Sequence, residues 1–391
     1  MVWGVQSMVA MMVPACTETP DGAPNIASLH GLRTVEAPPE VTDALGRTWT
    51  LRGDVADLRA AGSATGARVG LSEEDDAHDG GLALVTTGGA VYEAGPVDEE
   101  QLAAFVEGYY RRFGVAGDAE PVAETPARDP LARVVGLTDD RGDLDEQARP
   151  YTNIRKLIFS VRGRDGTPLA GAAECSGVAL TPWLVLTAAH CLEARGGVAE
   201  DPETPPFPDD IRVCRDADAR TDRYDADCAN AGLFLVNVDW SNLSFRADWA
   251  LVHTDWMVSD FTPDFALAPS DFESRPGQVV NGAGFPGGNV RYPAGVSYPS
   301  GVRHFGCEVY QTYERRLSYN CDTVGGQSGQ PVWVKESDGD RFVVAVHAGT
   351  TGLWNAGARM SFWSDEVLSA MGSVGVGQRS DNGSAWEAVL P

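Results

Sequence analysis

The chain has 391 residues, of which 43% are hydrophobic and 22% charged, as in an ordinary globular protein of two or three domains. Its 30 basic and 56 acidic residues give a net charge of −26, which argues against nucleic acid or an anionic membrane surface as the main partner. The seven cysteines are an odd number, so at least one is expected outside any intramolecular disulfide.

The chain opens with a short apolar stretch that reads MVWGVQSMVAMMVPAC and contains no Lys or Arg. It is too short to span a membrane and resembles the apolar core of a secretory signal. Its last four residues, Val13 to Cys16, also resemble a bacterial lipobox, in which the cysteine becomes a lipidated N-terminus. We therefore expect residues 1–16 to be a leader of an exported protein, either secreted or held at the surface or in the periplasm by a lipidated Cys16. The alternative is a disordered start with one incidental cysteine.

Residues 17–133 predict a small α+β unit with no catalytic constellation. A Thr-Gly-Gly turn between two short apolar runs predicts a hairpin over 82–92. Asp98 predicts the cap of a helix whose apolar residues continue at helical spacing until Gly114. The segment 115–133 is rich in Pro, Ala and acidic residues, which is typical of a linker.

From residue 134 onward the chain consists of short β-rich runs separated by Gly, Pro, Asn and Asp. This pattern predicts an all-β sandwich or barrel. One helix is expected near the end, with Ser364 as its N-cap and Gly372 at its end.

Three segments carry residues suited to nucleophilic catalysis. His190 lies in Thr-Ala-Ala-His-Cys, Asp248 precedes an apolar run, and Ser328 lies in Gly-Gly-Gln-Ser-Gly. Peptide hydrolysis needs a nucleophile, a base that takes its proton and an acid that holds the base, and these residues can fill the three roles. Each of them alone also fits a structural role. Their order along the chain differs from the Ser-acid-His order of nucleophile-elbow hydrolases and the Asp-His-Ser order of subtilisins.

In this order and with these flanking residues, residues 134–372 resemble the chymotrypsin-like serine proteases. The resemblance implies two six-stranded antiparallel β-barrels with a C-terminal helix, and a triad of Ser328, His190 and Asp248 that hydrolyses polypeptides. It also implies an oxyanion hole made by the backbone N–H groups of Gly326 and Ser328. The enzyme is expected to be a monomer that needs no cofactor. The alternative from another class is a non-catalytic binding protein with a protease fold.

Within that family, the residues around the nucleophile resemble the bacterial glutamyl endopeptidases. Gln327 precedes the nucleophile, where trypsin-like enzymes keep an Asp for activation. The resemblance implies that Thr323 and His347 bind the acidic side chain of the residue before the cut. A hydroxyl and an imidazole form strong hydrogen bonds to a carboxylate. We therefore expect cleavage after Glu, or after Asp.

A trypsin-like specificity for Arg or Lys stays open as the alternative. Asp322 lies six residues before Ser328, where trypsin keeps the Asp that binds a basic side chain. Trypsin also has a cysteine four residues before its serine, but here that position is Val324 and the cysteine is Cys321. Because the loop is anchored differently, acidic specificity is favoured.

Residues 134–141 resemble the start of mature glutamyl endopeptidases. Cleavage after Arg133 would free the amine of Val134, which the resemblance assigns to binding of the acidic side chain. On this interpretation residues 17–133 are a propeptide that is removed, and residues 134–391 are the catalytic domain. The alternative is that 17–133 form an independent binding or anchoring domain.

The six cysteines of the catalytic region allow fifteen pairings. The resemblance implies a disulfide that closes the loop carrying the histidine, and a second that braces the loop before the nucleophile. The expected set is Cys175–Cys191, Cys307–Cys321 and Cys214–Cys228. Six paired cysteines fit an oxidising compartment.

Two other motifs match known ligand-binding patterns only in part. Residues 282–287 match the dinucleotide fingerprint GxGxxG, but the Pro- and Gly-rich sequence that follows does not predict a helix. The acidic loop 216–227 lacks the central Gly and terminal Glu of an EF-hand, so a solvated loop is favoured over a calcium site. We expect neither a metal nor a cofactor.

Overall fold

The computed structural model describes parts of both expected halves of the chain. The residues it describes are 29, 33–55, 58, 81–112, 142–145, 148–160, 173–192, 210–215, 228–239, 244–255, 258, 264–287, 301–350, 354–374, 377–379 and 386–388. The expected leader, the expected cleavage site at Arg133 and the acidic loop 216–227 lie outside these residues.

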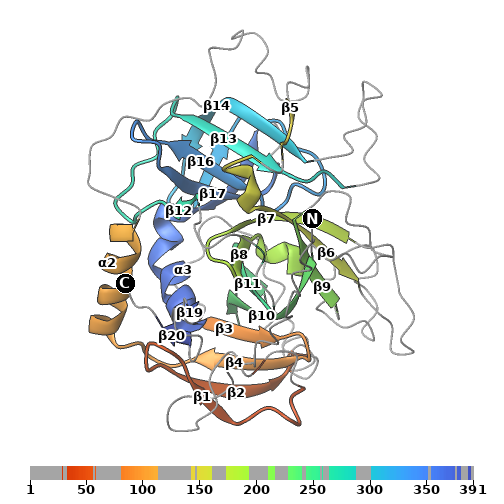
Figure 1. Ribbon diagram of the computed structural model, residues 1–391, viewed down its shortest axis with the longest axis vertical. Coiled ribbons are helices and arrows are strands. Elements are labelled where there is room, and N and C mark those ends of the chain that lie inside the picture. The colour runs from red at the N-terminus through yellow and green to blue at the C-terminus, as the bar shows by residue number, and fades with distance from the viewer. Residues whose placement is uncertain are drawn as a thin grey trace, which may run out of the picture.

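Six antiparallel strands form the first barrel, in the order β6-β7-β8-β11-β10-β9 (Figure 1). The pairing of β9 with β6 and with β10 closes the ring, which leaves only short stretches of free strand edge. The strands are β6 (Ile154–Ser160), β7 (Ala173–Ala179), β8 (Leu184–Thr187), β9 (Asp210–Cys214), β10 (Cys228–Asp239) and β11 (Ser244–Thr254).

A second ring of six antiparallel strands runs β13-β14-β15-β18-β17-β16 and closes between β16 and β13. Two short strands add to its edges, β5 (Gly142–Asp143) on β14 and β12 (Ala266–Leu267) on β17. The six strands of the ring are β13 (Val279–Gly284), β14 (Val302–Thr312), β15 (Arg316–Tyr319), β16 (Pro331–Lys335), β17 (Arg341–Thr350) and β18 (Asn355–Arg359).

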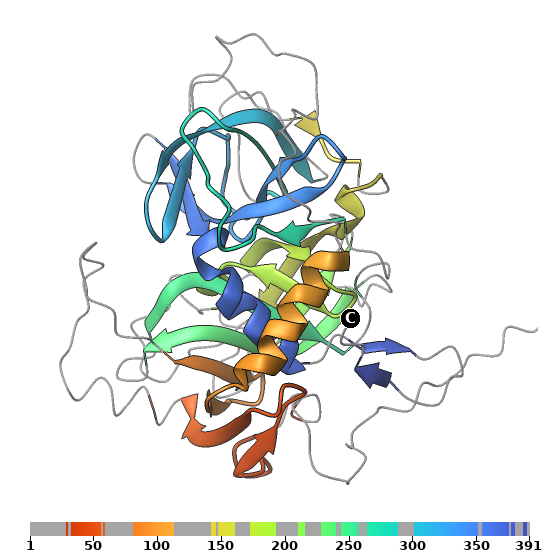
Figure 2. The same cartoon turned by 90° about the vertical axis from the view of Figure 1, so that its left-hand side faces the viewer.

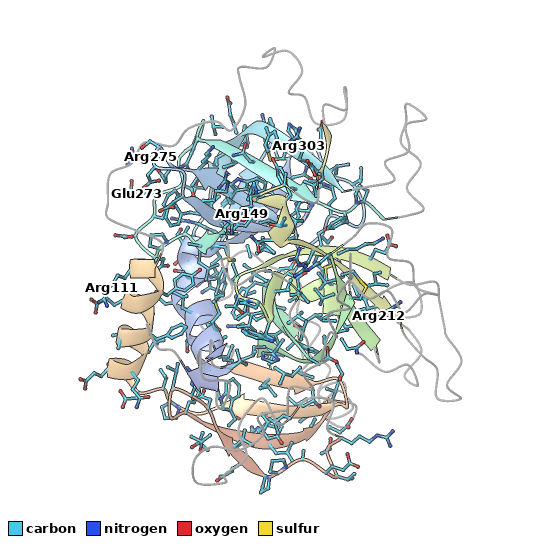
Figure 3. All side chains as sticks on the ribbon, in the orientation of Figure 1. Arg111, Arg149, Arg212, Glu273, Arg275 and Arg303 are labelled. Carbon is cyan, nitrogen blue, oxygen red and sulfur yellow. A yellow bond between two sulfur atoms is a disulfide. The ribbon has the colours of Figure 1, made fainter. Side chains whose placement is uncertain are left out.

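The short helix η3 (Tyr151–Asn153) leads into β6 and packs against the second barrel. The guanidinium of Arg303 on β14, labelled in Figure 3, lies 4.9 Å from the ring centroid of Phe305 and 5.7 Å from that of Tyr151. Cation–π contacts of this kind hold η3, which precedes the first barrel in the chain, against the second barrel.

The C-terminal helix α3 (Met360–Val374) directly follows β18. The expectation that Ser364 caps this helix is wrong, because Ser364 is fully buried inside it. The apolar spacing that begins at Val367 continues upstream through Trp363 to Met360, so the helix starts one turn earlier. The all-β class with two six-stranded barrels and a C-terminal helix is confirmed, and it is the architecture of the chymotrypsin-like fold.

The N-terminal unit, defined as residues 33–55 and 81–112, consists of four strands and a helix. The predicted hairpin is confirmed as β3 and β4, and the predicted helix starts after Asp98, whose carboxylate accepts the N–H groups of Glu100 and Gln101. The strand order β1-β2-β4-β3-β10 continues the sheet of the first barrel. The elements are β1 (Glu40–Thr42), β2 (Thr48–Asp54), β3 (Leu82–Thr86), β4 (Ala90–Ala94) and α2 (Glu99–Arg112).

A separate two-stranded sheet joins β19 (Gly377–Arg379) and β20 (Trp386–Ala388). No helix within the described part of the chain has both the length and the apolar character needed to cross a membrane.

Candidate active site

The predicted base and acid, His190 and Asp248, are brought together by two paired strands of the first barrel. His190 lies in the short helix η4 (Ala189–Leu192), which begins two residues after β8 ends at Thr187. Because Thr187 pairs with Ala250 of β11, Asp248 lies directly beside that helix. The ring atom Nδ1 of His190 is 2.9 Å from Asp248 Oδ2 and 3.1 Å from Oδ1, and the His190 backbone N–H donates to Oδ1 at 3.0 Å.

This contact fixes which ring nitrogen of His190 carries the proton. Burial would raise the pKa of Asp248, but the hydrogen bonds and charge of His190 outweigh it, so the pKa of Asp248 is lowered. The ionised carboxylate only accepts hydrogen bonds, so Nδ1 must be the donor and Nε2 the acceptor. The His190 side chain keeps 40% of its surface exposed, which leaves the ring accessible to a substrate.

Ser328 lies in the segment between β15 and β16, and two contacts hold that segment against the first barrel. The Ser328 carbonyl accepts the N–H of Ser176 on β7 at 2.7 Å. The next residue, Gly329, is so close to Thr187 that a Cβ there would lie 2.1 Å from its Oγ1. The structure therefore places Ser328 near the residues that precede His190. Among the described residues, no hydrogen bond links the Ser328 side chain to His190.

Around Ser328, two backbone N–H groups have no hydrogen-bond acceptor in the part of the chain that the structure describes. Within the described residues, Gly326 and Ser328 donate to no group, whereas Gln327 donates to the Val324 carbonyl and Gly329 to that of His347. Gly326 has a φ of +93°, and a Cβ there would lie 2.1 Å from the backbone nitrogen of Gly287. Only glycine fits this position without displacing the backbone of Gly287.

Ser176 is a site residue whose role the sequence did not reveal. Its hydroxyl accepts the N–H of Phe285 at 2.8 Å and donates to the Gly326 carbonyl at 2.9 Å. With its own N–H bound to the Ser328 carbonyl, Ser176 joins the first barrel to both residues of the expected oxyanion hole. The only sequence signal was its place beside Cys175.

Two buried glutamines brace the same segment. Gln327 accepts the N–H of Val324 at 2.9 Å and donates to Gln330 at 2.8 Å. Gly284 packs against Gln330, because a Cβ there would lie 2.6 Å from Gln330 Oε1. This close packing explains a glycine of the GxGxxG match without a nucleotide.

His347 on β17, expected to bind substrate, is 3% exposed and lies beside the segment that carries Ser328. Its carbonyl accepts the Gly329 N–H at 2.7 Å, and its N–H donates to the Gln330 carbonyl at 2.9 Å. Burial lowers the pKa of His347 to about 3; the charge of His190 lowers it further, and that of Asp248 opposes the shift. The imidazole is therefore neutral at pH 7.

The hydroxyl of Tyr319, at the end of β15, lies 2.7 Å from Nδ1 of His347. Burial raises the pKa of Tyr319 well above its ordinary value, so the phenol keeps its proton. Since this is its only hydrogen-bond partner among the described residues, Tyr319 is the donor and Nδ1 the acceptor. The neutral ring then carries its proton on Nε2, for which the described part of the chain offers no acceptor.

Of the two other residues expected to bind the acidic side chain, the structure describes Thr323 only. Thr323 is half-buried in the segment before Ser328, and Val134 lies outside the described residues. The neighbouring Asp322 is also half-buried, and its backbone N–H donates to Nδ1 of the buried His304 at 2.6 Å.

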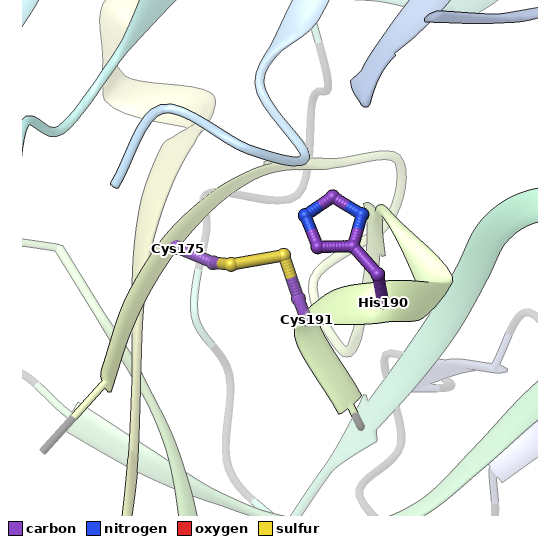
Figure 4. Close-up of side chains that lie close together, drawn as sticks. All are labelled: Cys175, His190 and Cys191. Atoms are coloured by element: carbon purple, nitrogen blue, oxygen red, sulfur yellow. A yellow bond between two sulfur atoms is a disulfide. The ribbon is translucent and has the colours of Figure 1, made fainter. Parts of the chain in front are cut away.

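The described residues form three disulfides, in the expected pairings Cys175–Cys191, Cys214–Cys228 and Cys307–Cys321. Figure 4 shows the ring of His190 beside the first of them. A ring nitrogen of His190 and the two sulfur atoms lie within 4.8 Å of one another. Because these sulfurs are bonded to each other, neither is the thiolate that a metal site would need.

We expect the buried His347 to make the protein less stable in acid. Its folded-state pKa of about 3 lies below the ordinary 6.5, so the unfolded chain binds more protons between these values, and stability falls as pH falls through that range. Between pH 7 and pH 5 this group alone should remove about 2 kcal/mol of unfolding free energy. Urea unfolding of the wild type and of His347→Gln at both pH values measures it. An equal pH dependence in the two proteins would contradict the prediction.

No protein-family model matches the sequence, and no curated protein matches it. Among solved structures, a Glu endopeptidase in complex with MPD is similar with a TM-score of 0.44 and 19% identity, over 61% of this chain and 99% of that chain. GrC is similar with a TM-score of 0.42 and 13% identity, over 59% of this chain and 98% of that chain.

Proposed function

We propose that the chain is a serine endopeptidase with Ser328 as nucleophile, His190 as general base and Asp248 as the group that orients the base. The observation that carries the proposal is the contact of Nδ1 of His190 with both carboxylate oxygens of Asp248, at 2.9 and 3.1 Å. It leaves Nε2 as the atom that can accept a proton, on an imidazole that a substrate can reach.

The reaction follows from these roles. Nε2 of His190 takes the Ser328 hydroxyl proton as Oγ attacks the scissile carbonyl, and Asp248 stabilises the imidazolium that forms. The N–H groups of Gly326 and Ser328 stabilise the oxyanion of the tetrahedral intermediate. His190 then gives the proton to the leaving amine, and water hydrolyses the acyl-enzyme with His190 again as base.

We propose further that the enzyme cleaves after Glu, or after Asp. The support is His347, whose Nε2 carries a proton and has no acceptor among the described residues, on a strand bonded to the nucleophile segment. A donor of this kind suits a carboxylate. Thr323 and a free Val134 amine would complete the pocket. With a net charge of −26, the protein does not attract acidic substrates over long range, so selectivity must come from these local contacts.

The three disulfides support export, because disulfides persist in oxidising compartments. In this proposal residues 1–16 direct export, Cys16 is a candidate lipid anchor, and cleavage after Arg133 creates the N-terminus at Val134. The catalytic domain is then 134–391.

One assay tests the chemistry and the specificity together. Peptides that differ only in the residue before the scissile bond, Glu, Gln, Arg or Phe, are incubated with the wild type and with Ser328→Ala, after mass spectrometry has defined the N-terminus. We expect cleavage of the Glu peptide by the wild type alone. Cleavage only after Arg would assign the pocket to Asp322 and overturn acidic specificity. No cleavage by a correctly processed protein would favour a non-catalytic binding protein.

Tyr319→Phe should weaken the preference for Glu over Gln by about 5- to 30-fold, the effect of losing one buried hydrogen bond. Without the hydroxyl, Nδ1 of His347 no longer has to be an acceptor, and the proton is no longer held on Nε2. The measurement is the ratio of kcat/KM for matched Glu and Gln peptides. The Gln peptide is the control, because a general structural defect would slow both. An unchanged ratio would contradict the role of Tyr319.

A further inference from the structure

The N-terminal unit is joined to the first barrel through the part of strand β10 that β9 does not pair with. Strand β10 is longer than its neighbour β9, which pairs only with residues 228–230. Where β9 stops, β3 continues, with residues 82–86 paired to residues 233–237 of β10. The backbone of this part of β10 would otherwise be an unpaired edge, which sheet proteins avoid exposing to water.

The C-terminal helix α3 also depends on the N-terminal unit for its burial. Twelve of its 15 residues are buried, and from Val367 to Val374 the buried residues lie on every side of the helix. Figures 1 and 2 show α2 running along α3, and the Tyr109 hydroxyl of α2 accepts the N–H of Leu267 at 2.9 Å. Leu45 packs so closely on α3 that a Cβ at Gly372 would lie 2.7 Å from its Cδ1. A helix segment that is buried on every side needs a covering element, and the N-terminal unit supplies part of that cover.

Buried polar groups cross the same interface. The guanidinium of Arg47, 3% exposed, lies over the ring of Trp49 and donates to the hydroxyl of Ser369 on α3. The backbone N–H of Ala44 donates to the carbonyl of Ser373 at 3.4 Å. If the unit left, Ser369 and the apolar face of α3 would be exposed together.

The described hydrogen bonds that hold the unit end on residues other than those of the candidate active site. Besides the ladder between β3 and β10, they join the unit to Gly232, Val238, Leu267, Ser369 and Ser373. These contacts therefore use none of the groups proposed for catalysis.

We infer that the N-terminal unit stays bound after the chain is cut between residues 113 and 133, so that the mature protein is a two-chain assembly. The surface that holds the unit consists of residues 233–237 of β10 together with helix α3. A cut after Arg133 would then free the Val134 amine without releasing the unit. The inference does not depend on the proposed peptidase activity.

The test uses the full chain with Ser328→Ala, to prevent self-cleavage, and a recognition sequence for a site-specific protease inserted between residues 113 and 133. After cutting, denaturing mass spectrometry verifies two fragments, and native mass spectrometry and gel filtration at micromolar concentration report their association. We expect the fragments to stay together in buffer and to separate only in urea. Separation in buffer would overturn the inference, whether or not the remaining fragment stays folded.

A second variant tests whether the described packing holds the fragments. Gly372→Ala places a methyl group against Leu45, so we expect at least tenfold weaker association of the cut fragments, measured by exchange with isotope-labelled protein. Alanine favours helix over glycine, so the weakening cannot come from a less stable α3. The double variant Leu45→Ala with Gly372→Ala should show a smaller loss than the sum of the two single changes. Equal affinity in wild type and Gly372→Ala would contradict the packing.

Discussion

Replacing Asp248 with Asn should lower kcat by about 10⁴-fold while leaving the protein folded. The carboxylate accepts the Nδ1–H and the backbone N–H of His190, and its pKa is lowered, so it is ionised under assay conditions. An asparagine amide can instead donate to Nδ1, which moves the ring proton to Nε2 and leaves His190 unable to take the proton of Ser328. The imidazolium of the transition state also loses its counter-charge.

The matched control for this change is Asp255→Asn at the end of the same strand. Asp255 is exposed and accepts two hydrogen bonds from Asn230, at 2.9 and 3.1 Å, away from the histidine. We expect its kcat to stay within about twofold of the wild type, because an exposed polar substitution changes little. Steady-state kinetics on the Glu peptide compare the two variants. A loss below tenfold in Asp248→Asn would contradict the assignment of Asp248.

The sequence predicted those parts of the fold and site whose signals are local. The hairpin β3–β4, the helix that begins after Asp98 and the β-rich texture beyond residue 134 follow from turn residues, caps and short apolar runs. The histidine, aspartate and serine could be proposed because each lies in a short characteristic segment. The predicted start of α3 was wrong. Ser364 is a good cap residue by local sequence, whereas tertiary burial extends the helix to Met360.

Contacts between distant segments could not be predicted. Tyr319 and His347 are 28 residues apart on strands whose residues read as ordinary core positions, so nothing in the sequence pairs them. The pairing of residues 82–86 with 233–237 joins two continuous apolar runs. Such runs specify burial but not a partner. The resemblance of residues 134–141 to a mature N-terminus predicts a propeptide at 17–133, but nothing in the sequence indicates how residues 17–133 pack against the first barrel.

Gly326→Ala should lower kcat/KM for the Glu peptide by about 10²- to 10³-fold, the loss expected when one oxyanion donor is displaced. The residue has a φ of +93°, and an added Cβ would lie 2.1 Å from the backbone nitrogen of Gly287. Backbone atoms cannot swing aside as a side chain can, so the segment from Gly326 to Ser328 must move. The backbone N–H groups of Gly326 and Ser328 would then be displaced from the positions proposed for the oxyanion hole.

Gly339→Ala separates this effect from simple backbone strain. Gly339 has a similar φ of +105°, in the turn between β16 and β17, but no atom lies within 4 Å of the position that its Cβ would take. Both variants should lose about 1 kcal/mol of stability from the left-handed backbone, and urea unfolding measures that loss. Only Gly326→Ala also has the clash, so only that variant should lose activity. If both variants kept kcat/KM within threefold of the wild type while folded, Gly326 would not belong to the oxyanion hole.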